Sequence, residues 1–124
     1  MNLDKNLAVL IVRIIIGGIF IIAGWMKVSD MAMAASYFND LGIATFLAYI
    51  VAYAELLGGL ALVLGLWQHI SATVLGVIML GAIYYSVSGG FPGVMGPLSL
   101  LAGLVSLLGT GPGKFTVRSR ALNS

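Results

Sequence analysis

Four apolar runs, each close to the length that a helix needs to cross a lipid bilayer, constrain this chain more than any other feature. The hydrocarbon core is about 30 Å thick and a helix rises ~1.5 Å per residue, so one crossing takes about 20 apolar residues. Because 60% of the 124 residues are hydrophobic and 8% are charged, the chain cannot cover itself with the polar surface of a soluble domain. The sequence therefore predicts an all-α integral membrane protein.

The predicted fold is a bundle of four transmembrane helices in a single domain over residues 1–124. A short amphipathic helix at about 30–40, N-capped by Asp30 or Ser29, is predicted to lie on the membrane surface between the first two spans. Pro97 falls within the last apolar run, which leaves a re-entrant half-helix as the alternative to a full crossing. The predicted spans are residues 7–27, 44–66, 70–88 and 92–109, followed by a basic tail at 113–124.

The distribution of basic residues favours one orientation in the membrane. Four crossings place both termini on the same side, and cytoplasmic loops carry an excess of Lys and Arg. Both termini are therefore predicted to be cytoplasmic, and a re-entrant last segment would instead put the basic tail outside. The basic residues expected on the cytoplasmic side are Lys5, His69, Lys114, Arg118 and Arg120.

One acidic residue, Glu55, lies near the middle of the second apolar run. A charged side chain at the centre of a bilayer costs about 2.5 kcal/mol or more, so such a residue faces protein or water and finds a partner. Arg13 is expected ~9 Å deep in the first span and Glu55 ~16 Å deep from the same face. We expect these two side chains to interact inside the bundle and to be the catalytic candidates. The alternative is that the pair only fixes helix assembly.

Other residues complete the candidate ligand site. Lys27 closes the first span, where it can anchor the helix to headgroups or contact a ligand. Tyr84 and Tyr85 end the third span as part of an aromatic belt, and their hydroxyls are able to bond a headgroup or a quinone carbonyl. Glycines allow close helix contacts, and six are predicted to lie in them: Gly17, Gly24, Gly58, Gly59, Gly65 and Gly76.

The content of ligating side chains argues against a metal centre. The chain has no Cys, one His and four carboxylates, so thiolate, disulfide and common metal-ligand arrangements are not expected. The expected surroundings are the lipid bilayer and, by way of the glycine faces, a partner subunit or further copies of the chain. No nucleic-acid partner is expected.

Five short segments follow one another along the chain. They are Arg13 with Gly17, Gly24-Trp25-Met26-Lys27, Tyr37-Phe38 with Leu41-Gly42-Ile43, Glu55-Leu56-Leu57-Gly58-Gly59-Leu60-Ala61-Leu62 with Gly65, and Thr110-Gly111-Pro112-Gly113-Lys114-Phe115. In this order they resemble the DoxX family of small four-helix membrane proteins of bacteria and archaea. The chain departs from relatives at Trp67-Gln68-His69, where a basic pair is common. It departs again at Tyr84-Tyr85-Ser86, where some relatives carry a histidine.

The resemblance implies a protein of the cytoplasmic membrane, similar to membrane subunits of thiosulfate:quinone oxidoreductase, with functional residues at Arg13, Lys27 and Glu55. Three functions remain open. The first is a membrane subunit that binds a quinone and supports an oxidoreductase partner, with Glu55 handling the proton. The second is a non-enzymatic anchor or assembly protein, and the third is a carrier for a small solute.

Overall fold

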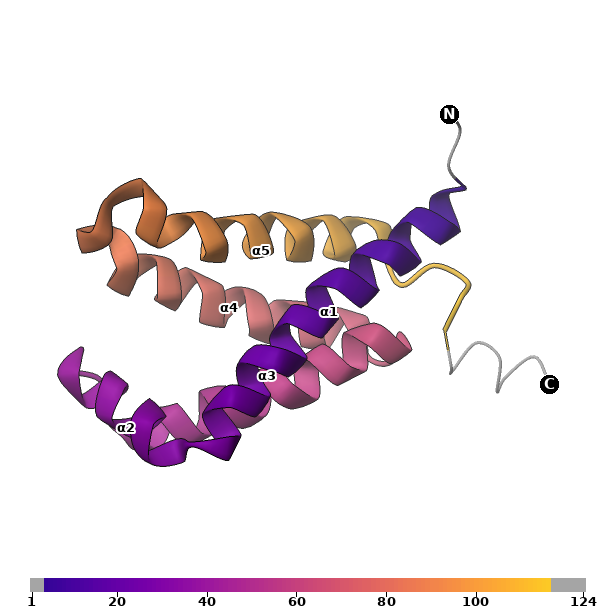
Figure 1. Cartoon of the computed structure of the whole chain (residues 1–124). Helices are drawn as coiled ribbons and strands as arrows, with labels where there is room; N and C mark the ends of the chain where they lie inside the picture. The colour runs from indigo at the N-terminus through magenta and orange to yellow at the C-terminus, as the bar shows by residue number, and fades with distance from the viewer. Residues whose placement is uncertain (1–3, 117–124) are drawn as a thin grey trace.

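The computed structural model describes residues 4–116, and the regular structure within this range is helical throughout. Three continuous stretches are long and apolar enough to cross a membrane, namely residues 5–29, 46–64 and 68–110. The third stretch has 43 residues, about twice the length of one crossing, and it folds back on itself as a hairpin (Figure 1). The predicted all-α membrane bundle is confirmed. The elements are α1 (Lys5–Ser29), α2 (Met31–Asp40), α3 (Phe46–Leu64), α4 (Gln68–Ser86), η1 (Val87–Gly89) and α5 (Gly90–Thr110).

The long helices form two antiparallel pairs, α1 with α3 and α4 with α5 (Figure 1). The start of α1 and residues 111–116 lie at one end of the bundle, which we call the terminal end. The short helix α2 and the turn between α4 and α5 lie at the opposite end, which we call the α2 end. The two pairs approach each other at the terminal end and diverge toward the α2 end, as Figure 1 shows.

The last helix is continuous from Gly90 to Thr110, with Pro97 in its second turn. Its 21 residues correspond to about 31 Å, which is enough for a full crossing. The length of this helix therefore permits a full crossing, which stays a prediction. Near the turn that precedes it, Gly93 approaches the Ser86 carbonyl so closely that an added Cβ would come within 2.7 Å of that oxygen.

Glycines bring α1 and α3 into close contact. A Cβ added at Gly17 would lie 2.7 Å from the carbonyl oxygen of Gly59, and one at Gly24 would lie 2.9 Å from that of Ala52. Gly58, on another face of α3, faces α4, where an added Cβ would lie 3.1 Å from the Leu75 side chain. Gly76 differs, because a Cβ there would make an ordinary 3.8 Å contact with Leu101. The backbone contact between α1 and α3 thus depends on residues without side chains.

The helix α2 begins where its capping residue was predicted. The Asp30 carboxylate accepts a hydrogen bond from the Met33 backbone N–H at 3.2 Å, so Asp30 is the N-cap. The helix packs against α3 and α1, and its Ala34 is buried. Its placement on the membrane surface stays a prediction.

The buried guanidinium of Arg13 joins three segments at the terminal end. Its Nε donates to the Leu62 carbonyl at 2.9 Å and its Nη2 to the Val63 carbonyl at 3.0 Å. Its Nη1 donates to the carbonyls of Pro112 and Phe115, both at 2.8 Å. The last carbonyls of a helix have no partner within the helix, so Arg13 caps α3 and places its positive charge at the negative end of the α3 dipole.

The end of α3 leaves no room for a side chain beside this arginine. Gly65 has a φ of 77°, in the left-handed region that favours glycine at a helix C-terminus. A Cβ there would come within 3.0 Å of Arg13 Nη2 and 2.7 Å of the Thr116 Cβ. Asn6 adds a further tie, because its Oδ1 accepts from the Lys114 N–H at 3.1 Å. Residues 112–116 are therefore fastened between α1 and α3.

Adjacent glycines of α1 provide a matched test of the contact with α3. We expect Gly17→Ala to lower the free energy of unfolding by about 1–3 kcal/mol, because the new methyl group overpacks against the Gly59 carbonyl. Gly18 has no atom within 4 Å of an added Cβ, so Gly18→Ala should be neutral or stabilising by up to ~1 kcal/mol. Unfolding of both variants in the same detergent measures the difference. Equal effects would contradict the assigned contact.

The Arg13 arrangement predicts that lysine cannot replace arginine. We expect Arg13→Lys to lower the free energy of unfolding by about 2–4 kcal/mol, since an ammonium has three donors on one atom and cannot replace all four hydrogen bonds of the guanidinium. The C-terminal segment should also loosen, so trypsin should cleave after the exposed Lys114 several times faster than in the wild type. Lys5→Gln, at the exposed start of α1, is the control and should change neither measurement. Unchanged cleavage in Arg13→Lys would disprove the tie.

Candidate functional site

The buried carboxylate of Glu55 is paired with Lys27 and not with Arg13. Lys27 Nζ lies 2.8 Å from Glu55 Oε1, and the two side chains are 29% and 5% exposed, respectively. The predicted Arg13–Glu55 interaction is wrong, because the four hydrogen bonds that the Arg13 guanidinium donates all go to backbone carbonyls. The buried acidic residue therefore has a partner, as expected for a charge within a membrane helix, but the partner comes from the other end of α1.

The register of α1 against α3 explains this choice of partner. Gly24 packs between Ala52 and Leu56, so Glu55 lies at about the level of Gly24 along α1. Lys27 is three residues further along α1, or about 4.5 Å. Arg13 is eleven residues away in the other direction, or about 16 Å, which an arginine side chain does not span. The prediction had assumed that the ends of the two spans are level, and they are not.

The direction of the side chains also favours the pairing of Lys27 with Glu55. Every Cα–Cβ bond in a helix tilts toward the N-terminus of that helix. In antiparallel helices, Lys27 therefore points back toward the level of Glu55, while Glu55 points toward the α2 end, where Lys27 lies. Arg13 points away from Glu55, toward the terminal end. A lysine at the C-terminal end of a membrane helix thus reaches inward, and here it does not act as the headgroup anchor that was the alternative for Lys27.

The ion pair lies in the wall of a cavity of about 340 Å³ between α1, α2, α3 and α4. The wall is mainly apolar, and Glu55 and Met79 are its buried members. Polar groups other than the ion pair are found nearer to the α2 end, on Tyr37, Tyr85 and Ser86. The lining residues are Lys27, Tyr37, Phe38, Leu41, Ile43, Leu47, Val51, Glu55, Ile78, Met79, Gly81, Ala82, Tyr85 and Ser86.

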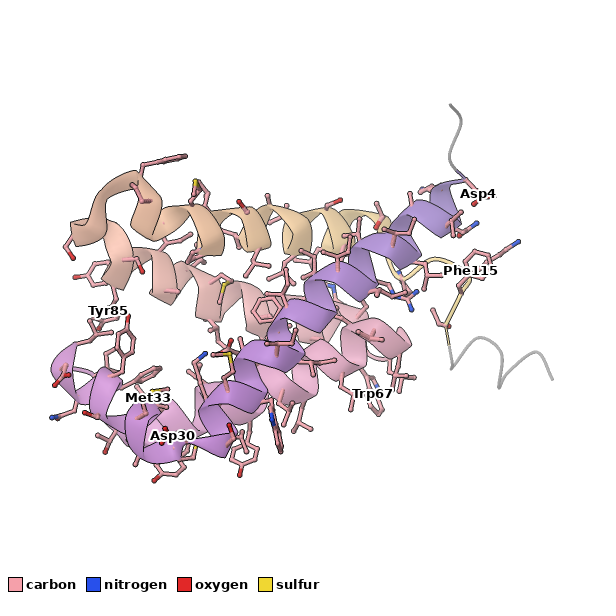
Figure 2. All side chains as sticks on the ribbon, viewed as in Figure 1. Asp4, Asp30, Met33, Trp67, Tyr85 and Phe115 are labelled. Carbon is pink, nitrogen blue, oxygen red and sulfur yellow. The ribbon has the colours of Figure 1, made fainter. Side chains whose placement is uncertain are left out.

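The structure separates the other candidates into two groups. Tyr85 lines the cavity, and Figure 2 shows it at the end of α4 close to α2. Tyr84 packs edge-to-face on Tyr85, with ring centroids 5.0 Å apart, but it is 74% exposed and does not line the cavity. Arg13 lies at the terminal end, outside the cavity. Lys27, Glu55 and Tyr85 are therefore the sequence candidates that the fold brings around one space.

Sequence reasoning missed the wall that α2 provides. Tyr37 and Phe38 of α2, and Leu41 directly after it, line the cavity, whereas the sequence indicated only an amphipathic helix at about 30–40. The helical spacing of Phe38 and Leu41 was the available signal, because an apolar stripe packs equally well against protein and against lipid. The sequence alone did not decide between the two.

Chemically, the site combines an apolar space with one ammonium and one carboxylate. Such a space suits a ligand with flat or aliphatic apolar faces and a polar group that accepts a hydrogen bond from the ammonium. The carboxylate beside it is able to take up or release a proton. Within residues 4–116, no three His, Cys, Asp or Glu side chains come together as a metal-ion site would require.

The ion pair predicts a specific pattern of non-additivity. Glu55→Leu or Lys27→Met alone should lower the free energy of unfolding by about 2 kcal/mol or more, because each leaves an unpaired charge inside the bundle. The double variant should cost clearly less than the sum of the two single changes. Combining Glu55→Leu with Arg13→Lys should instead be additive, since these sites share no partner. Unfolding in detergent measures all the variants, and coupling of Glu55 to Arg13 would contradict the assignment.

Comparison with known proteins places the chain among membrane proteins of one family. The DoxX family model matches residues 8–88, which include α2, α3 and α4 in full and nearly all of α1. YqjF of Escherichia coli, an "Inner membrane protein", is 30% identical over 124 aligned residues, covering 96% of this chain and 95% of YqjF. Rv3486 of Mycobacterium tuberculosis, an "Uncharacterized membrane protein", is 31% identical over 131 residues, covering 91% of this chain and 80% of Rv3486.

A third relative carries a functional name. The protein called "Putative oxidoreductase CatD", from Bacillus subtilis, is 32% identical over 83 residues, which are 67% of this chain and 62% of CatD. The chain thus spans less than two thirds of that relative. No solved structure gives a significant match. The family model covers well over half of the chain, and YqjF matches along almost its whole length. The resemblance that the five sequence segments indicated is therefore confirmed, and the chain belongs to the DoxX family.

Proposed function

We propose that the chain is a membrane subunit that binds a quinone in the cavity beside Lys27 and Glu55 and so supports a quinone-linked oxidoreductase. The observation that carries this proposal is the position of a buried ion pair in the wall of an otherwise mainly apolar cavity. Stability alone gives little reason for such an arrangement, because removing two charges from water costs about as much as their attraction returns.

The cavity has a suitable size and chemistry for a quinone ring. Ligand pockets commonly measure about 300–1,000 Å³ and have apolar walls with a few polar groups that fix orientation, and this cavity has about 340 Å³. A quinone ring has apolar faces and two carbonyl acceptors. The Lys27 ammonium has three N–H donors, of which one is directed at Glu55, so further donors remain for a carbonyl of the ligand.

Glu55 supplies the acid–base part of the proposal. Reduction of a quinone to a quinol takes up two electrons and two protons. A carboxyl group within reach of a ligand oxygen can deliver a proton and be reprotonated afterwards, with Lys27 stabilising the carboxylate in between. The electrons are assigned to a partner subunit or a reduced small molecule. Arg13 has no chemical role in this proposal, because its donors are directed at backbone carbonyls.

The comparisons support the proposal only at the level of the family. CatD carries the word oxidoreductase in its name, but the match covers 62% of that protein. For location, we propose the cytoplasmic membrane of a prokaryote, in line with the name of YqjF. We also propose cytoplasmic termini, since Lys5 and Lys114 both lie at the terminal end. Arg118 and Arg120, which also supported the prediction of cytoplasmic termini, lie outside the described residues 4–116.

The proposal is tested by extracting the detergent-purified protein with organic solvent and identifying quinone from its mass and its ultraviolet redox difference spectrum. We expect about one quinone per chain in the wild type and at least a tenfold loss in Glu55→Gln and Lys27→Met. Asp40→Asn, a matched carboxyl change at an exposed position outside the cavity, should retain the wild-type amount. Absence of quinone from folded wild-type protein, or its retention in both site variants, would refute the proposal.

A further inference from the structure

We infer that the cavity exchanges its ligand and protons with one face of the membrane only, the face that carries α2. The identity of the ligand rests on the proposed function, whereas the one-sided access rests on packing alone. The path to Glu55 is set by the residues that lie between this carboxylate and each end of the bundle.

On the α2 side, the cavity extends continuously from Glu55 toward the end of the bundle. The lining residues of α3 are Glu55, Val51 and Leu47, at successive turns, and those of α4 run from Ile78 to Ser86. Eight residues of helix correspond to about 12 Å, so the cavity extends about this far from the carboxylate. The side chains near its mouth are partly open to the surroundings, with Tyr37 59% exposed and Tyr85 41% exposed.

On the terminal side of Glu55, buried apolar side chains of the described helices pack together. Phe20 is 1% exposed, and Leu62, Ala72 and Leu75 are fully buried. They form one cluster with buried residues of α5, including Leu104 and Leu107. Beyond this cluster, the Arg13 guanidinium and residues 112–116 cover the end of α3. A hydrated path from the terminal end would have to separate all of these contacts.

Lys27 places a positive charge on the path from the α2 side to Glu55. Its ammonium comes from the α2 side of Glu55, so a proton or ligand that approaches the carboxylate from that side meets the ammonium first. The path is otherwise lined mainly by apolar residues and by the hydroxyls of Tyr37, Tyr85 and Ser86. Tyr37, Tyr85 and Lys27 are the titratable groups that share the cavity with Glu55 among residues 4–116.

The chain lacks cysteine, so single introduced thiols report access without interference. Ala82→Cys and Val51→Cys place thiols on opposite walls of the cavity, and Ala72→Cys places one in the packed cluster. Met33→Cys on α2 and Lys114→Cys at the terminal end report the two membrane faces. Each variant is treated, in sealed vesicles of both orientations, with a small charged methanethiosulfonate reagent that does not cross membranes.

We expect the thiols at positions 82 and 51 to react at least tenfold faster when the reagent is on the side where the thiol at 33 reacts. The thiol at 72 should be protected from both sides and should react after denaturation. Reaction at 82 or 51 from the side that labels 114, or equal reaction from both sides, would overturn the inference, as would rapid labelling at 72. Because the test needs no quinone, one-sided labelling can hold even if quinone extraction fails.

Discussion

The close contact between α1 and α3 is the constraint on which the remaining structure depends. Gly17 and Gly59 allow the two backbones to approach until an added Cβ would lie 2.7 Å or less from the opposing carbonyl. In a membrane, where burial of apolar surface does not drive helices together, such backbone proximity is a main source of helix association. The contact also fixes the register, and the register determines which charged residues can meet. The pairing of Lys27 with Glu55 and the capping of α3 by Arg13 both follow from it.

The cations Arg13 and Lys27 of α1 are stabilised in different ways, and each way matches the chemistry of its side chain. Arg13 has a planar fork of donors, which satisfies carbonyls of α3 and of residues 112–115 at the same time. Lys27 is a compact charge on a flexible stem, and it meets a single carboxylate. The four hydrogen bonds of Arg13 all close the terminal end. The pairing of Lys27 with Glu55 leaves N–H donors of the ammonium free to turn toward the cavity.

Helical periodicity and the lengths of the apolar runs were sufficient to predict the all-α membrane fold, and Asp30 was a readable capping signal. The charged candidates Lys27 and Glu55 were also identified from the sequence, because ionisable residues are rare in membrane helices. The pairing of these two residues was not predicted from the sequence, because it depends on the register of α1 against α3, which composition does not encode. A shift of a few residues in this register decides whether Arg13 or Lys27 is close enough to pair with Glu55. The contribution of α2 to the cavity was missed for a similar reason, because an apolar stripe does not reveal what it packs against.

The two ends of the bundle differ in a way that stability alone does not explain. At the terminal end, Gln68 Nε2 donates to the Leu107 carbonyl at 2.9 Å and the core between the helix pairs is closed. At the α2 end, Gly81 has no atom within 4 Å of an added Cβ, and the helix pairs diverge around about 340 Å³ of space. A cavity forfeits dispersion contacts, and a buried ion pair returns little net stability. The proposed ligand would fill this cavity and contact the ion pair, which would account for both features together.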